Sequence, residues 1–247
     1  MSEAGKIFVG IGGWNFAPWR GSFYPKGLTQ SRELHFASRE LTSIEINSTF
    51  YGLQKPATFK KWHDETPDGF VFSVKAPRFV TQRKNLAESA SSVERFLESG
   101  ILQLGAKLGP INWQLAPTKQ FDAEELAAFL ALLPRKLEGR TLRHALEVRH
   151  ASFDCEEFVS LAREHQVAVV EAGDSAYPQI QARSASFSYL RVMGTKASVP
   201  KGYTPAALAR WQKQAQTLAR DGDVFLYFIS GAKERNPHAA RALLEAL

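Results

Sequence analysis

The chain has 247 residues, of which 44% are hydrophobic and 23% are charged, and its formal net charge is +6. These proportions are ordinary for a globular protein and exclude a disordered or collagen-like chain. The single cysteine, Cys155, excludes an internal disulfide and a cysteine zinc cluster. No apolar stretch reaches the roughly 18 residues of a membrane span, and the first six residues lack the apolar core of a secretion signal. We therefore expect a cytoplasmic protein with no membrane partner.

Eight short runs of β-forming residues follow one another along the chain, at 6–12, 42–47, 69–75, 107–115, 143–148, 167–171, 187–192 and 223–229. Amphipathic helical patterns lie between most of them and after the last, at 31–40, 57–65, 88–99, 122–133, 155–165, 205–220 and 237–247. Only the link between the sixth and seventh runs lacks a clear helical pattern. The alternation predicts the α/β class and a single (β/α)8 barrel of the TIM type over residues 1–247, with one helix irregular or missing.

The structural alternative is a doubly wound open sheet with a phosphate-binding turn after the first strand. Gly10 and Gly12 begin a Gly-x-Gly pattern, but Asn15 stands where the third glycine belongs, and no helical pattern opens there. We therefore reject a dinucleotide-binding fingerprint.

Positive charge is concentrated in two segments that contain no Asp or Glu. Residues 175–220 carry seven Lys and Arg, and residues 69–87 carry four. Such concentrations favour an anionic partner, either nucleic acid or a phosphorylated small molecule. The alternative is a solvated basic surface with no partner.

Polar residues gather where the predicted strands end. Barrel enzymes have their active site at the carboxyl ends of the strands, so we predict a functional site there. Along each strand these polar residues alternate with aliphatic ones, which places them on the face opposite to the helices. The alternative is a buried ion-pair network that only closes the top of the barrel. The polar residues are Glu45, Asn47, Ser73, Lys75, Asn112, Gln114, Glu147, Arg149, Asp174 and Arg191.

Three carboxylates, Glu45, Glu147 and Asp174, are the candidate catalytic residues, because a buried carboxyl beside cations has a tuned pKa suited to general acid or base catalysis. Arginine and lysine would hold a phosphate group. Hydrolysis of a phosphoester or glycosidic bond is the reaction class that this set favours. The same carboxylates, with His150, could hold Mg²⁺ or Mn²⁺, but their spacing does not require a metal.

The long loop after the first strand is rich in aromatic residues and forms either a packed lid or a platform for stacking a base or sugar ring. We assign eleven residues to substrate binding, although the strand alternation points His150 away from the mouth: Trp14, Trp19, Arg20, Asn47, Tyr51, Lys75, Arg78, Gln114, Arg149, His150 and Arg191.

Several motifs are similar to those of the YecE-like family, a TIM-barrel domain of unknown function. The resemblance covers nearly the whole chain. It implies the barrel and a motif-lined mouth but no reaction. The motifs are Gly12-Gly13-Trp14, Trp19-Arg20-Gly21, Phe23-Tyr24-Pro25, Glu45-Ile46-Asn47-Ser48-Thr49-Phe50-Tyr51, Thr66-Pro67-Asp68-Gly69-Phe70, Lys75-Ala76-Pro77-Arg78, Lys107-Leu108-Gly109-Pro110, Gln114-Leu115-Ala116-Pro117 and Glu147-Val148-Arg149-His150.

The chain departs from this family at three places near the predicted mouth. Met193 stands where the family tends to have His, and Ile229 and Ser230 stand where it usually has two Asn. Ala151-Ser152-Phe153 replaces the usual Pro-Ser-Trp. If those groups carry out chemistry in relatives, this chain is altered or inactive while still binding a ligand.

Three functions therefore compete. The first is an enzyme acting on a phosphate-bearing substrate, and it predicts that Glu45→Gln or Glu147→Gln abolishes turnover but not binding. The second is a non-catalytic nucleic-acid-binding protein, which predicts binding that falls steeply with salt. The third is a sugar or sugar-phosphate enzyme or binding protein, which predicts thermal stabilisation by a small molecule.

Overall fold

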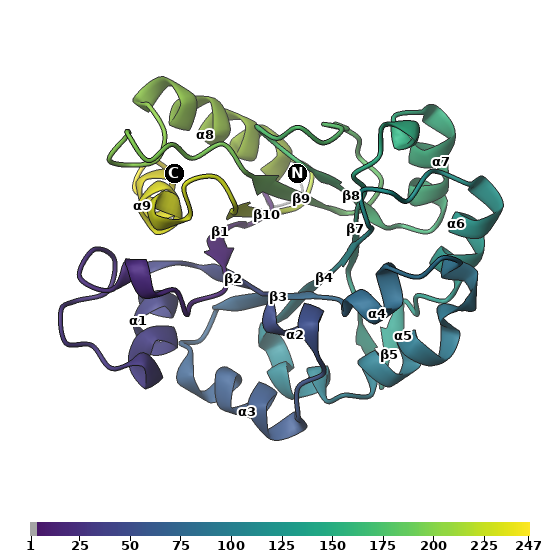
Figure 1. Cartoon of the computed structure of the whole chain (residues 1–247), viewed down its shortest axis with the longest axis horizontal. Helices are drawn as coiled ribbons and strands as arrows, with labels where there is room; N and C mark the ends of the chain where they lie inside the picture. Colours follow the sequence, from purple (N-terminus) through teal and green to yellow (C-terminus); the bar gives the residue numbers. More distant parts are fainter. Residues whose placement is uncertain (1–3) are drawn as a thin grey trace.

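The computed structural model of the chain describes residues 4–247, so the first three of the six residues searched for a secretion signal lie outside the described part. Eight parallel strands close into a barrel in the order β1-β10-β9-β8-β7-β4-β3-β2 (Figure 1). Because β1 pairs with both β10 and β2, the open-sheet alternative is excluded and the predicted barrel is confirmed. The strands are β1 Ile7–Gly12, β2 Ser43–Ile46, β3 Val71–Lys75, β4 Leu108–Gln114, β7 His144–Glu147, β8 Ala168–Glu171, β9 Phe187–Val192 and β10 Asp223–Phe228.

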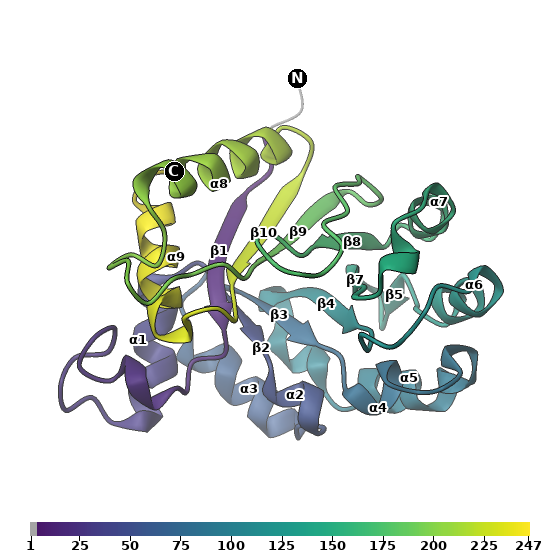
Figure 2. The same cartoon turned by 45° about the horizontal axis from the view of Figure 1, so that its top comes forward.

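Helices surround the barrel, and the two that follow β9 and β10, α8 and α9, pack against β1 and β10 (Figure 2). The predicted helices correspond to α1 Glu33–Glu40, α3 Pro56–Glu65, α5 Ala90–Leu97, α6 Ala123–Ala131, α7 Glu156–Glu164, α8 Pro205–Ala219 and α9 Asn236–Leu244. The link between β8 and β9 contains no helix, as predicted. Within residues 4–247 no helix combines the length and the apolar character that crossing a membrane requires.

Two single-turn helices and two very short strands of the described chain were not predicted. The single-turn helices α2 Ser48–Tyr51 and α4 Arg78–Thr81 begin within a few residues of the ends of β2 and β3, and they are too short to show a helical period in the sequence. The two-residue strands β5 Lys136–Leu137 and β6 Arg140–Thr141 form a small antiparallel sheet outside the barrel.

Two helix starts show why their sequences fold as helices. The carboxylate of Asp122 accepts a hydrogen bond from the Glu125 backbone N–H at the start of α6. The Thr204 hydroxyl accepts one from the Ala207 backbone N–H at the start of α8, where proline occupies the first turn. Each cap satisfies a backbone donor that a helix start leaves free.

The barrel interior changes character along its axis. At the amino end, Phe8 stacks on Phe225 with ring centroids 4.9 Å apart, and Phe187 meets Phe225 edge-on at 5.9 Å. In the middle, the Tyr227 hydroxyl lies 2.8 Å from the Ser43 hydroxyl. At the carboxyl end the inward-facing residues carry charge. The barrel therefore has an apolar floor, a layer of hydroxyl groups and a charged upper layer.

A cationic cavity at the carboxyl end of the barrel

A cavity of about 710 Å³ opens at the carboxyl ends of the strands. Its size lies within the roughly 300 to 1,000 Å³ of small-molecule sites. Four cationic side chains line it, and none of the described residues in its wall is acidic. The charged and aromatic wall residues are Lys75, Arg149, Arg191, Lys233, Trp14, Phe50, Tyr51 and Trp62, and the other wall residues are Gly12, Gly13, Asn15, Asn47, Ser48, Gln54, Gln82, Gln114, Ile229 and Ser230.

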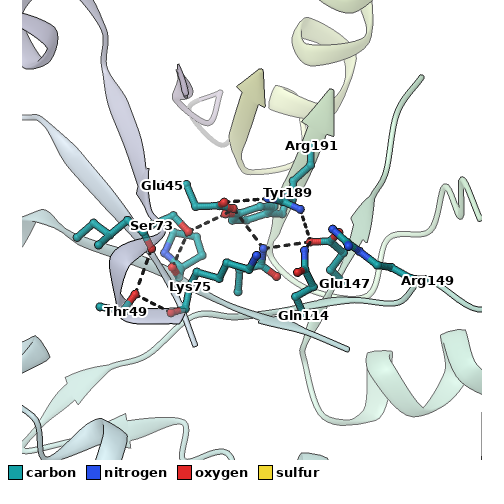
Figure 3. Close-up of polar contacts among 12 residues, drawn as sticks. Glu45, Thr49, Ser73, Lys75, Gln114, Glu147, Arg149, Tyr189 and Arg191 are labelled. Atoms are coloured by element: carbon teal, nitrogen blue, oxygen red, sulfur yellow. Dashed lines mark hydrogen bonds and ion pairs between the residues drawn. The ribbon is translucent and has the colours of Figure 1, made fainter. Parts of the chain in front are cut away.

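Two fully buried carboxylates lie beneath this wall, and Arg191 joins them (Figure 3). One Arg191 Nη lies 2.6 Å from Glu147 Oε2, and the other lies 3.1 Å from Glu45 Oε1. Burying a carboxylate is costly unless it is paired and hydrogen-bonded, and these contacts offset that cost for both side chains.

Neutral donors complete the coordination of the two carboxylates. The Tyr189 hydroxyl donates to Glu45 Oε2 at 2.7 Å, and the Gln114 amide donates to Glu147 Oε2 at 2.7 Å. The Asn112 amide lies between them, 3.2 Å from Glu45 and 3.4 Å from Glu147. The network therefore spans the upper barrel from β2 to β9 and fixes the geometry of the cavity floor.

The charges in this network control the protonation of Glu147. Burial by itself would raise its pKa, but the positive charges of Arg191, Arg149 and Lys75 outweigh it and lower the pKa to about 2. Burial likewise favours the neutral form of Arg191, and the two carboxylates reverse that effect and raise its pKa. Both groups are therefore charged at neutral pH.

Lys75 has a different environment from the two arginines. Its side chain lies inside the cavity wall, its ammonium lies 4.0 Å from the centroid of the Phe50 ring, and its Nζ forms no hydrogen bond or ion pair with any described residue. Burial, the charge of Arg191 and, to a smaller extent, that of Arg149 lower the pKa of Lys75, while Glu45 and Glu147 raise it, and the net value is about 8. In a fraction of the molecules Lys75 is therefore uncharged near neutral pH.

The structure brings seven of the predicted binding residues together in the cavity wall. Four others lie elsewhere. The Trp19 indole is buried and donates to the Lys233 carbonyl. Arg20 pairs with buried Glu33 at 2.7 Å, and the Arg78 guanidinium lies 5.8 Å from the centroid of the Tyr51 ring without reaching the wall. His150 contacts the Ser152 hydroxyl outside the cavity. The seven in the wall are Trp14, Asn47, Tyr51, Lys75, Gln114, Arg149 and Arg191.

The aromatic loop after β1 divides between its two predicted roles. Trp19, Phe23 and Tyr24 are buried and pack on one another, with Phe23 and Tyr24 also meeting Phe36 of α1. These three side chains pack within the loop and against α1, as expected if the loop is a packed lid. Trp14 alone reaches the cavity, where its ring meets Trp62 edge-on at 5.2 Å.

The three carboxylates predicted as catalytic do not gather at one point. Glu45 and Glu147 lie below the cavity wall, and Asp174 accepts hydrogen bonds from Arg210 at 2.8 Å and from the Trp211 indole at 3.0 Å. Within the described residues no cluster of three or more His, Cys, Asp and Glu side chains is placed to hold a metal ion. The donor set suggested for Mg²⁺ or Mn²⁺ therefore does not fit such an ion.

Several residues of the site escaped the sequence prediction, among them Trp62, Tyr189 and Lys233. Tyr189 lies two residues before Arg191 on β9, and the strand alternation that placed Arg191 inward would have placed Tyr189 inward as well. Lys233 follows β10 and had no neighbouring motif to mark it. Of the departures from the family pattern, Ile229 and Ser230 line the cavity, and Met193 is buried outside its wall.

Part of the concentrated positive charge is neutralised by acids from elsewhere in the chain. In residues 175–220, Arg183 pairs with Asp221 at 3.2 Å, Lys201 with Glu245 at 3.8 Å and Arg210 with Asp174 at 2.8 Å. Arg191 pairs with the two buried carboxylates. The other three cations of this segment, Lys196, Lys213 and Arg220, are exposed and form no ion pair with a described residue, so the ion pairs interrupt the basic surface without removing it.

Fold and site together define a TIM-barrel protein with a cavity lined by cationic side chains at its mouth. Residues 8–247 match the family model described as a protein of unknown function, DUF72, and the chain belongs to that family. It is similar to the UPF0759 protein YecE of Escherichia coli strain K12, with 29% identity over 150 residues, which are 60% of this chain and 50% of YecE. It is also similar to the UPF0759 protein YunF of Bacillus subtilis strain 168, with 32% identity over 126 residues, which are 49% of this chain and 44% of YunF. The matches thus span about half the length of these relatives.

Solved structures of the same family share the fold. A DUF72 family protein from Thermotoga maritima superposes with a TM-score of 0.76 at 23% identity, covering 97% of both chains. One from Enterococcus faecalis gives a TM-score of 0.71 at 17% identity, covering 98% of both chains. These likenesses establish the barrel and carry no statement about a reaction.

Proposed function

We propose that the cavity binds a small molecule that carries a phosphate or similar anionic group. The observation that supports this proposal is that Lys75, Arg149, Arg191 and Lys233 line the cavity while no acidic side chain does. Arginine side chains suit a phosphate group because the guanidinium donates two parallel hydrogen bonds to its oxygens.

The body of the ligand would lie against the aromatic part of the wall. Trp14 and Tyr51 flank the cavity, and the Tyr51 ring is 71% exposed. An aromatic ring that is free on one face can stack on a sugar or a base. The combination favours a phosphorylated sugar or nucleotide over an inorganic anion alone.

A small ligand fits the structure better than nucleic acid. A nucleic-acid surface needs unpaired cations spread along a groove, because each phosphate contact releases counterions. Outside the cavity, three of the six cations of residues 175–220 pair with acids, which interrupts the basic surface. Lys75 and Lys233 instead line a cavity of the size of a small molecule and form no ion pair with a described residue.

We do not extend the proposal to hydrolysis by a carboxylate. Glu45 and Glu147 are fully buried and do not line the cavity. A general base must reach the proton that it removes, and Glu147, with a pKa of about 2, has no proton to donate at neutral pH. The two carboxylates instead hold Arg191 in place.

Thermal unfolding in the presence of ribose 5-phosphate, with ribose as the uncharged comparison, tests the proposal. We expect ribose 5-phosphate to raise the unfolding temperature and ribose to leave it unchanged. A ligand at a hundred times its Kd stabilises a protein by about 2.7 kcal/mol. Equal effects of the two compounds, or no effect of either the sugar phosphate or inorganic phosphate, would overturn the proposal.

Two variants locate the binding. Arg149→Met removes a cavity cation, and Lys136→Met removes an exposed cation in β5 outside the cavity. We expect the first to abolish the stabilisation by ribose 5-phosphate and the second to preserve it. Circular dichroism of the unliganded variants confirms that both are folded.

A further inference from the structure

We propose that Lys75 forms a Schiff base with an aldehyde or ketone that also carries the anionic group held in the cavity. This inference rests on the proposed function, since it assigns a substrate class to the same cavity. It uses a cavity cation beside the carboxylate network whose amino group forms no hydrogen bond or ion pair with any described residue. It adds a covalent step to the binding described above.

The position of Lys75 is the first support. It is the last residue of β3, so its backbone is fixed by strand pairing on both sides, to Asn112 on β4 at its own position and to β2 along the preceding residues. The Thr49 hydroxyl also donates to the Lys75 carbonyl at 2.7 Å. A nucleophile carried on a rigid strand is held in one geometry toward its target.

The second support is that the amino group is both unpaired and accessible. Arg149 and Arg191 are each engaged by Glu147, whereas no described residue accepts a hydrogen bond from Lys75 Nζ. Nζ is also not among the buried polar atoms that lack a partner, so it opens on the cavity. A lysine that served only to neutralise the barrel would be expected to contact a carboxylate.

The third support is the electrostatic environment, which favours the uncharged amine. Burial and the neighbouring guanidinium of Arg191 lower the pKa of Lys75 to about 8, and Glu45 and Glu147 offset part of this effect. At pH 7 the Lys75 amine is then neutral in about one tenth of the molecules. Lysines become nucleophiles in this way, by desolvation and by a nearby cation.

The step balances without a further reactant. The Lys75 ammonium loses one proton to solvent, and neutral Nζ attacks the carbonyl carbon to form a C–N bond. One Nζ proton passes to the carbonyl oxygen, which takes a second proton from solvent and leaves as water. The product is an imine that keeps one hydrogen and one positive charge on Nζ. Arg149 and Arg191 retain the anionic group throughout.

Borohydride trapping tests the inference. The protein is incubated with pyridoxal 5′-phosphate, which carries both an aldehyde and a phosphate, then reduced with sodium borohydride, and the modified lysines are mapped by mass spectrometry. We expect Lys75 to be labelled at least tenfold faster than any other lysine, including Lys233 in the same cavity. Inorganic phosphate should slow labelling at Lys75, and uncharged pyridoxal should label it more slowly.

The matched variants are Lys75→Arg, which keeps the charge but cannot form the imine, and Lys136→Arg as the control. Labelling at the selective rate should vanish in the first and persist in the second. Equal labelling of many surface lysines, or no slowing by phosphate in the wild-type protein, would overturn the inference. If Lys75→Arg is still stabilised by ribose 5-phosphate while selective trapping fails in the wild type, the Schiff base is wrong and the anion site stands. If the wild-type protein is neither selectively labelled nor stabilised by ribose 5-phosphate, both proposals fail.

Discussion

The two ends of the barrel interior are filled with opposite chemistry. At the amino end, Phe8 stacks on Phe225 at 4.9 Å, Phe187 meets Phe225 edge-on at 5.9 Å, and Ala145 and Ala168 complete an apolar plug. At the carboxyl end, β2 and β7 carry two carboxylates, and guanidinium and amide groups bind them (Figure 3). The barrel therefore separates apolar packing from buried charged groups along one axis.

The two ends should respond differently to substitution. At the amino end a substitution is tolerated if it keeps the volume and shape of the side chain. At the carboxyl end, removing one charged partner leaves another charge buried without its counterion. Four predictions follow from this contrast, in order of decreasing effect.

Arg191→Met should cause the largest loss. It leaves Glu45 and Glu147 buried without their shared cation, which costs about 3 to 5 kcal/mol of unfolding free energy. Phe225→Ala at the amino end costs a similar amount by leaving a cavity. Urea unfolding at pH 7 and pH 5 distinguishes them. Without the Arg191 charge, Arg149 and Lys75 are the cations left to oppose burial, so the pKa of Glu147 rises above its wild-type value. Partial protonation of Glu147 then lessens the loss at pH 5, while the Phe225→Ala loss stays the same. Equal losses at both pH values in Arg191→Met would contradict the network.

Glu147→Gln should change the acid stability. The pKa of Glu147 is lowered from 4.5 to about 2, so its charge stabilises the fold above pH 4.5 and this contribution is lost as the pH falls toward 2. By linkage the contribution is on the order of 3 kcal/mol. Acid unfolding followed by circular dichroism should show a shallower pH dependence in the variant. Parallel curves for wild type and variant would show that Glu147 does not titrate with folding.

Trp19→Phe should have a moderate effect on stability and none on ligand binding. The change removes the indole hydrogen bond to the Lys233 carbonyl and some buried volume, costing about 1 to 2 kcal/mol. Because Trp19 does not line the cavity, the affinity for ribose 5-phosphate should stay the same. A binding defect in a folded Trp19→Phe protein would restore its predicted role in stacking.

The smallest expected effect is the pH dependence of anion affinity. Sulfate keeps a constant charge between pH 7 and 9, whereas Lys75, with a pKa of about 8, loses its charge over that range. We expect the sulfate affinity to fall several-fold, equivalent to about 1 kcal/mol, as the pH rises. Lys75→Arg should remove this dependence. An unchanged wild-type affinity would show that Lys75 does not contact the anion.

The sequence predicted the barrel well because strand and helix periods depend on local residue order. The alternation at Glu45, Lys75, Glu147 and Arg191 also placed these side chains correctly on the inner face. Depth along the barrel axis could not be predicted in the same way. It depends on strand register, and register decides that the carboxylates lie below the cavity while Lys75 and Arg149 line it.

Ion pairs between segments distant in the sequence were the second feature that the sequence could not predict. The pairing of Asp174 with Arg210, and of Arg20 with Glu33, joins residues from separate elements, and no local pattern predicts it. Without those pairings, Asp174 looked like a member of the mouth and Arg20 like a free cation. The same holds for the acid-free segment, whose charge balance appears only in three dimensions.

The most direct test of the account is a calorimetric titration of the wild-type protein with ribose 5-phosphate and, separately, with ribose, at pH 7. We predict saturable binding of one ribose 5-phosphate per chain and no measurable binding of ribose, with the binding lost in Arg149→Met and kept in Lys136→Met. Equal binding of both compounds, or binding that survives in Arg149→Met, would contradict the assignment of an anion site to the carboxyl end of the barrel.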